Sequence, residues 1–218
     1  MCKRPEGSGL GVQVEAIKRK QYEDLLEPLE KELVAMARCA KATGARIVVL
    51  FGRSWYNRAG VERVMGFASE AQVAAFLDHA PKFERQLVDD EILLFKYWLA
   101  ADQAEQEARL KERLDDPLKR WRLSPTDFAA REKYQAYTDA REAMLAATQT
   151  DWAPWPLVDF NDQKRGRLTL IRDLLDRPPD TNVEPAPLDF PALGYEPLKE
   201  TYGVLNPIAG YPVPPESD

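Results

Sequence analysis

The sequence predicts an α/β protein with a parallel sheet. Two short, continuous runs of aliphatic and aromatic residues, 47–51 (IVVLF) and 92–98 (ILLFKYW), are typical of strands that are buried on both faces. A third strand is predicted over 156–160 (PLVDF). Helical periodicity fills the segments between these runs. Strands that alternate with helices indicate parallel strands joined by helical crossovers.

The first predicted helical stretch covers residues 13–43, where apolar residues recur at helical spacing. Pro28 lies inside it and is expected to separate two helices, because the residue before a proline avoids helical geometry. Gly44 follows as a C-terminal stop, since glycine tolerates the left-handed conformation that ends many helices.

Five further helical segments are predicted, at about 69–78 and 80–89 before the second strand, 102–114 after it, 124–147, and 162–176. The sequence SPTD opens the fourth of these. Its serine is a capping residue, its proline suits the first turn, and its aspartate faces the positive end of the helix dipole.

The chain divides into three parts by composition. Residues 1–12 are expected to be flexible, and residues 13–177 hold the predicted strands and helices. Residues 178–218 form a proline-rich tail, which holds ten of the 17 prolines and can scarcely form a helix. An extended arm and a disordered tail are both compatible with this composition.

Composition also limits function. The 218 residues carry a net charge of −6, and a general nucleic-acid surface would need a basic excess instead. The single histidine, His79, excludes multi-histidine zinc sites. Two cysteines form no disulfide framework, and no apolar run approaches the ~20 residues that span a bilayer. The N-terminus lacks the apolar core of a secretory signal, so a cytoplasmic protein that acts on neither nucleic acid nor membranes is expected.

Two basic segments are candidates for binding phosphate. Residues 52–63 (GRSWYNRAGVER) follow the first strand, and ligands of parallel sheets bind at strand ends. Arginine binds phosphate oxygens through a planar fork of donors. Residues 115–123 (DDPLKRWRL) lie between two predicted helices, where a mobile lid could sit. The alternative for both is a solvated loop whose charges pair with neighbouring carboxylates or with water.

Four segments, in order, resemble the polyphosphate kinase 2 family. Residues 53–67 (RSWYNRAGVERVMGF) resemble its signature, and residues 116–125 (DPLKRWRLSP) resemble its lid. The sequences ATG at 42–44 and WAPW at 152–155 are similar to segments that precede strands in the family. The resemblance covers about residues 15–177 and is far more specific than one short motif.

The resemblance implies a three-layer P-loop kinase-like fold. It also implies transfer of phosphoryl groups between inorganic polyphosphate and nucleoside diphosphates or triphosphates, usually with magnesium, by a homo-oligomer. Those phosphate compounds are the expected partners. In this sequence the implied catalytic residues are Arg53, Asn57 and Arg58, and the implied substrate-binding residues are Glu62, Arg63, Lys119, Arg120 and Arg122.

The sequence departs from the family pattern at two points. The family carries G-x-x-x-x-G-K directly after the first strand, and no such segment occurs here. Gly52 stands where the family has an aspartate that helps to hold magnesium. About two βα units of ~30 residues each are missing near residues 51–52.

Backbone N–H groups and the lysine of the missing loop cradle the phosphates. A chain without that cradle is expected to transfer phosphate slowly or not at all. A non-catalytic remnant that binds polyphosphate, or assembles with other subunits, is the alternative function.

Overall fold

The computed structural model describes residues 16–51, 54–178, 187, 189–199, 204 and 208. The chain divides into two units, residues 1–184 and residues 185–218. The second unit holds most of the proline-rich tail, and none of its described residues lies in a helix or a strand. The N-terminal segment 1–12, for which flexibility is predicted, lies outside the described part of the chain.

The strands form two two-stranded parallel sheets, which follow each other along the chain at residues 96–98 and are together termed the sheet. Their parallel pairing confirms the predicted α/β class. Strand β1 (Arg46–Leu50) pairs with β2 (Ile92–Lys96). Strand β3 (Trp98–Ala100) pairs with β4 (Leu157–Asp159). Parallel pairing follows from the helical crossovers that join these strands.

The prediction of a single strand over 92–98 is wrong, because this run is two strands separated at Tyr97. The Tyr97 N–H donates to the Leu50 carbonyl (2.8 Å), at the end of β1. The next N–H, of Trp98, donates to the Pro156 carbonyl (3.0 Å), just before β4. The chain changes its neighbour here because β1 ends at Leu50 and offers no further ladder.

One face of the sheet is covered by helices α3 (Glu70–Asp89) and α6 (Tyr134–Thr148). Leu50 of β1 and Leu94 of β2 point to this face and pack with Met144 of α6 in one apolar cluster. Alternate side chains of a strand point to opposite faces, so each strand here contributes to two cores.

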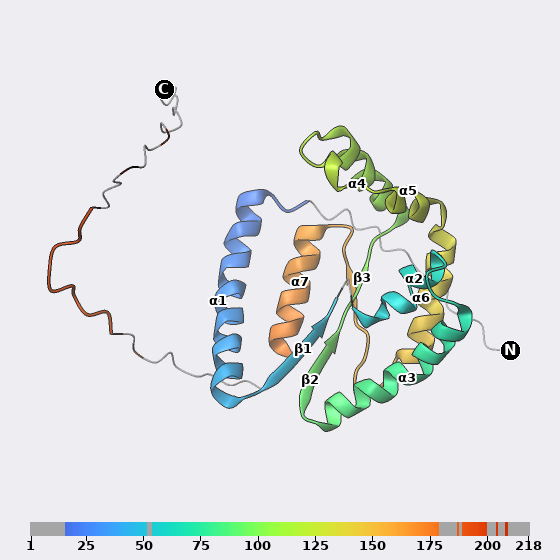
Figure 1. The fold of residues 1–218 in the computed structure, drawn as a ribbon, viewed down its shortest axis with the longest axis horizontal. Coiled ribbons are helices and arrows are strands. Elements are labelled where there is room, and N and C mark those ends of the chain that lie inside the picture. The colour runs from blue at the N-terminus through green and yellow to red at the C-terminus, as the bar shows by residue number, and fades with distance from the viewer. Residues whose placement is uncertain are drawn as a thin grey trace. The chain divides into compact units, whose positions relative to one another are not determined.

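The opposite face is covered by helices α1 (Arg19–Thr43) and α7 (Gln163–Asp176), which lie side by side in Figure 1. Phe95 of β2 and Val158 of β4 form a second apolar cluster there, with Met36 of α1 packed against it. Helices, sheet and helices make three layers, as predicted.

The helix breaks predicted at Pro28 and between residues 78 and 80 are wrong, since α1 contains Pro28 and α3 contains Pro81. A proline inside a helix removes one hydrogen bond and costs about 3 kcal/mol. Both helices are long and pack one face along their whole length, which outweighs that cost. Neither these nor any other described helix is long and apolar enough to cross a membrane.

Between the second strand run and β4 the chain forms helix α4 (Gln103–Asp115), the 3₁₀ turn η2 (Arg120–Arg122) and helix α5 (Pro125–Glu132). The single helix predicted over 124–147 is wrong, because α5 ends before Lys133 and α6 begins after it. The Lys133 backbone leaves helical geometry, and its ammonium group donates to the Val64 carbonyl (3.1 Å). This break lets α6 turn onto the sheet.

Helix α7 approaches β4 closely at Gly166. A Cβ atom at this position would lie 2.7 Å from the Asp159 carbonyl oxygen and 2.7 Å from a ring carbon of Phe160. Glycine is therefore the residue that permits this approach, because any side chain would meet backbone.

Candidate functional site

A cleft of about 620 Å³ opens at the end of β3. Its walls come from α4, α5 and α6 and from the segment after β1, which forms the 3₁₀ turn η1 (Trp55–Arg58) and the short helix α2 (Val61–Val64). Ligands of parallel α/β sheets bind at the carboxyl ends of the strands. The structure therefore places a cavity where the sequence predicts the site.

Turn η1 brings two motif residues to this cleft. The Ser54 hydroxyl accepts a hydrogen bond from the Tyr56 N–H (3.2 Å), and the Ser54 carbonyl accepts one from the Asn57 N–H (3.1 Å). Tyr56 and Asn57 both line the cleft. Only three residues separate Ser54 from Leu50, so the strand leads almost directly into the turn.

Asn57 is the one residue of the predicted site, among those that the structure describes, that lines the cleft. Arg53 lies outside the described residues, as does Gly52. Arg58 and Glu62 form an ion pair, with Nε 2.6 Å from Oε2. These two side chains balance each other's charge beside the cleft.

Arg63 is held away from the cleft by Glu70. Its Nε and Nη2 atoms donate to the two carboxylate oxygens at 3.2 and 3.0 Å. This forked pair is the geometry that arginine would otherwise offer to a phosphate.

The predicted lid residues also lie away from the cleft lining. Lys119 donates to Glu112 (2.5 Å), and this hydrogen bond raises the pKa of Lys119. Arg120 donates to a backbone carbonyl of α4, and Arg122 lies over the ring of Trp121, 5.2 Å from its centre. Trp121 is 76% exposed, so the cluster forms a basic and aromatic surface beside η2.

Four arginines that the sequence pattern did not single out line the cleft instead. They come from three helices and outnumber the cleft's three carboxylates. Two of them lie in the segment 102–114, whose sequence is that of a charged helix and does not mark them out. Their one sequence signal is the four-residue spacing on α4, which puts two arginines on one helix face. The four are Arg109, Arg113, Arg131 and Arg141.

These arginines differ in the hydrogen bonds and ion pairs that they form. Arg109 donates to two backbone carbonyls near the end of β4, and Arg131 binds Glu107 through Nε at 2.5 and 2.6 Å. Arg141 pairs with its neighbour Glu142 (2.6 Å). Arg113 forms neither a hydrogen bond nor an ion pair with any residue that the structure describes. Its guanidinium is therefore available to an anionic ligand.

The carboxylates of the cleft do not fit a magnesium site. Asp102 accepts a hydrogen bond from Asn161, Glu107 is paired with arginine, and Asp127 caps its own helix. The hydrogen bond from Ser124 lowers the pKa of Asp127. Within the described ranges, no three His, Cys, Asp or Glu side chains converge as metal ligands.

A buried ion pair lies directly behind the cleft. Lys96 of β2 donates to Glu84 of α3 (2.8 Å) and to the Thr148 carbonyl at the end of α6 (3.0 Å). Both charged side chains are fully buried. Burial lowers the pKa of Lys96, while the hydrogen bond from Lys96 to Glu84 opposes that effect.

Two aromatic residues of η1 share the same carboxylate. The Tyr56 hydroxyl donates to Glu84 Oε1 (2.7 Å), and the Trp55 indole N–H donates to the same oxygen (3.3 Å). Burial also raises the pKa of Tyr56. The sequence signal for this network is the lysine inside the apolar run 92–98.

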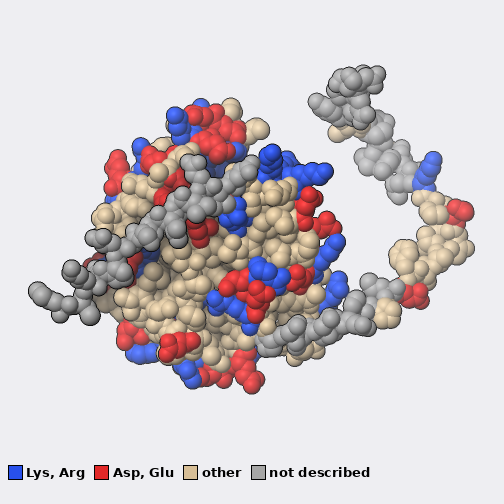
Figure 2. Space-filling view, turned by 180° about the vertical axis from the view of Figure 1, so that it is seen from behind, with Lys and Arg blue, Asp and Glu red and all other residues tan. Residues whose placement is uncertain are grey.

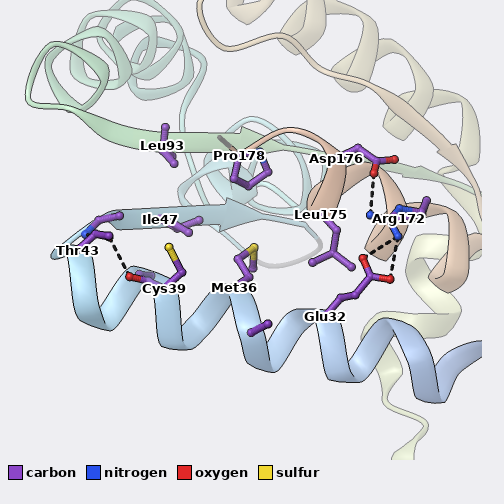
Figure 3. Close-up of a pocket in the computed structure, with 13 residues that line it drawn as sticks. Glu32, Met36, Cys39, Thr43, Ile47, Leu93, Arg172, Leu175, Asp176 and Pro178 are labelled. Carbon is purple, nitrogen blue, oxygen red and sulfur yellow. Dashed lines mark hydrogen bonds and ion pairs between the residues drawn. The ribbon is translucent and has the colours of Figure 1, made fainter. Parts of the chain in front are cut away.

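A second cavity, of about 570 Å³, lies at the opposite end of the sheet, between α1 and the end of α7 (Figure 3). Its lining is mostly apolar and includes Met36 and Ile47. The one guanidinium at its edge, Arg172, is held by Glu32 (2.8 Å) and Asp176 (2.7 Å). This cavity lies at the amino ends of the strands and is poorly suited to an anion.

The exposed charges do not form a single-sign field on the face in view. Figure 2 shows small groups of basic and acidic side chains interspersed over that face. A polyanion on this face would therefore meet charges of both signs.

Comparison with known proteins decides the family. Residues 25–185 match the family described as Polyphosphate kinase 2. The chain belongs to the polyphosphate kinase 2 family. It is 44% identical to the ADP-polyphosphate phosphotransferase of Pseudomonas aeruginosa over 169 residues, which are 78% of this chain and 54% of that protein. It is 47% identical to NDP-polyphosphate phosphotransferase 1 of Ruegeria pomeroyi over 150 residues, 69% of this chain and 49% of that protein. The chain thus spans about half the length of these relatives.

Solved structures of the polyphosphate kinase 2 family share the fold. A polyphosphate kinase 2 from Pseudomonas aeruginosa matches with a TM-score of 0.60 and 25% identity, over 74% of this chain and 47% of that one. A polyphosphate kinase 2 from Arthrobacter aurescens matches with a TM-score of 0.58 and 20% identity, over 78% of this chain and 86% of that one.

Proposed function

We propose that this chain binds inorganic polyphosphate and nucleoside phosphates in the cleft at the end of β3, as a polyphosphate:nucleotide phosphotransferase. The observation that carries the proposal is the cleft with its four arginines and Asn57 at the strand ends. Its relatives are named as polyphosphate phosphotransferases of ADP and of NDP, which fits the same substrate class. Arginine forks suit the closely spaced phosphates of such compounds.

Within the cleft, we assign Arg113 the first contact with phosphate, because it forms no hydrogen bond or ion pair with any described residue, although its charge also acts on Asp127. Arg141 lines the same cleft and pairs with the exposed neighbour Glu142, an interaction that a phosphate can replace. Asn57 offers amide donors to the same cleft. A requirement for magnesium stays a prediction from the family resemblance.

A second candidate is polyphosphate binding without phosphoryl transfer. The direct passage from β1 to η1 favours it, because three residues between Leu50 and Ser54 leave no room for a phosphate loop. Loss of a single electrostatic contact to a transition state typically costs about 100-fold or more in rate. Loss of a whole phosphate cradle should cost more.

The test measures binding and turnover on the same purified protein. Polyphosphate binding is titrated at several salt concentrations for the wild type, for Arg113→Ala/Arg141→Ala, and for the control Arg85→Ala. Arg85 lies on α3, is paired with exposed Asp89, and does not line the cleft. We expect the double variant to bind about tenfold or more weakly and with a smaller salt slope, and the control to match the wild type.

Equal affinity of the double variant and the wild type would refute the cleft as the binding site. Nucleotide formation from polyphosphate and magnesium, followed by a coupled luminescence assay, separates the two candidates. A rate comparable to that of an intact relative would support phosphotransfer, and binding without turnover would support the second candidate.

A further inference from the structure

We propose that Glu84 is a positioning residue for the cleft, which fixes turn η1, and with it Asn57, from behind. This inference rests on the proposed binding of phosphates in the cleft. Glu84 does not line the cavity itself. It acts through Tyr56, whose ring borders the cleft while its hydroxyl donates to the carboxylate at 2.7 Å.

Burial of the Glu84 and Lys96 charges costs free energy of folding. Removing two charges from water is expensive, and apolar residues of similar size often stabilise a core at least as well. A fully buried lysine and carboxylate are therefore weak evidence for stability. They are better explained by the specific contacts that they make.

The contacts of Glu84 and Lys96 connect elements that lie around the cleft. The Glu84 carboxylate accepts from Lys96, Trp55 and Tyr56, and Lys96 donates onward to the end of α6. Lys96 also lies 4.8 Å from the centre of the Trp155 ring. The pair thus joins α3, β2, η1, the end of α6 and the segment before β4. Three of these elements border the cleft or lead into it.

The first two residues of η1 supply its hydrogen bonds to helix α3. The turn follows β1 after three residues, two of which lie outside the described part of the chain. The Tyr56 and Asn57 N–H groups bond to Ser54, and the Ala59 and Gly60 N–H groups donate to the Tyr56 carbonyl. The hydrogen bonds from Trp55 and Tyr56 to Glu84 tie the turn to helix α3, and the two rings also pack edge to face on Phe83 and Phe76 of that helix. Asn57 follows Tyr56 directly in the sequence, so the contacts that fix Tyr56 also set the position of Asn57 in the cleft.

The experiment compares two neutral double variants. Glu84→Gln/Lys96→Met removes both charges but keeps an amide oxygen to accept from Tyr56 and Trp55. Glu84→Leu/Lys96→Met removes both charges and that acceptor as well. Melting curves set a working temperature at which both are fully folded, so that differences in affinity do not report unfolding.

We expect the Gln/Met variant to bind polyphosphate within about threefold of the wild type. The Leu/Met variant should bind about tenfold or more weakly, because the two donors lose their partner. The Trp55 indole N–H, assigned by Trp55→Phe, should exchange with solvent faster only in the Leu/Met variant. Equal affinity and equal exchange in the two double variants would overturn the proposal.

Tyr56→Phe covers the case in which the Leu/Met variant does not fold. It deletes one donor and leaves the ring, so about three- to tenfold weaker binding with faster amide exchange over residues 54–58 is expected. Unchanged binding and exchange would overturn the proposal. A wild type that binds no polyphosphate would refute the proposed function instead, and indole and amide exchange would still decide whether Glu84 orders the turn.

Discussion

Breaking the buried ion pair should destabilise the protein in a pH-dependent way. In Glu84→Gln, Lys96 stays fully buried without its anionic partner. Removal of one member of a buried pair costs about 3–5 kcal/mol. For a domain of this size each kcal/mol lowers Tm by roughly 2–4 °C, so a decrease of about 6–20 °C is expected near neutral pH.

The sign of the pH dependence follows from Lys96. Burial already lowers its pKa, and loss of Glu84 lowers it further, below the ~10.4 of an unfolded lysine. The unfolded state of the variant then binds more protons than the folded state between those two pKa values. The free energy of unfolding therefore rises with pH in that window, and the deficit relative to wild type shrinks at alkaline pH.

The assay is thermal and urea unfolding, followed by circular dichroism, from pH 6 to pH 10. The matched control is Asp78→Asn on the same helix, whose partner Lys82 is exposed, and no measurable change is expected there. A Glu84→Gln protein as stable as wild type at pH 7, or a deficit that does not vary with pH, would refute this reasoning.

Three further outcomes are expected. Gly166→Ala should lower the free energy of unfolding by about 1–3 kcal/mol, because its Cβ would meet a backbone oxygen at 2.7 Å; Gly194→Ala, with nothing within 4 Å, is the control in the same denaturation experiment. Lys119→Ala/Arg120→Ala should weaken polyphosphate binding and reduce its salt dependence in filter-binding assays, and an unchanged affinity would exclude the lid surface. The protein should self-associate in size-exclusion chromatography, because β2 is the one strand neighbour of β1 among the described residues and leaves an edge of β1 open. A monomer with strong amide protection over 47–51 would contradict this last expectation.

Local sequence was sufficient where an element depends on its own residues. The capping box at Ser124 and Asp127 forms as the sequence SPTD indicates, and α1 ends at Gly44, whose φ is 73°. Strands form in all three predicted apolar runs, although the run 92–98 divides at Tyr97, because continuous aliphatic residues bury well on both faces of a parallel sheet. The helix breaks predicted near the prolines do not form, because the free-energy cost of one proline is small beside the packing of a long helix.

The same distinction between local sequence and tertiary contacts applies to the candidate site. The sequence by itself determined the family and the α/β class, and it predicted a site after the strands, since motifs and hydrophobic runs are contiguous in the sequence. Only the tertiary structure decided which cations face the cleft, with Arg113 directed there while Arg63 pairs with Glu70. It alone revealed the contact between Glu84 and Lys96. Such pairings depend on which helix faces meet across the sheet, and residue spacing along the chain does not encode that distance.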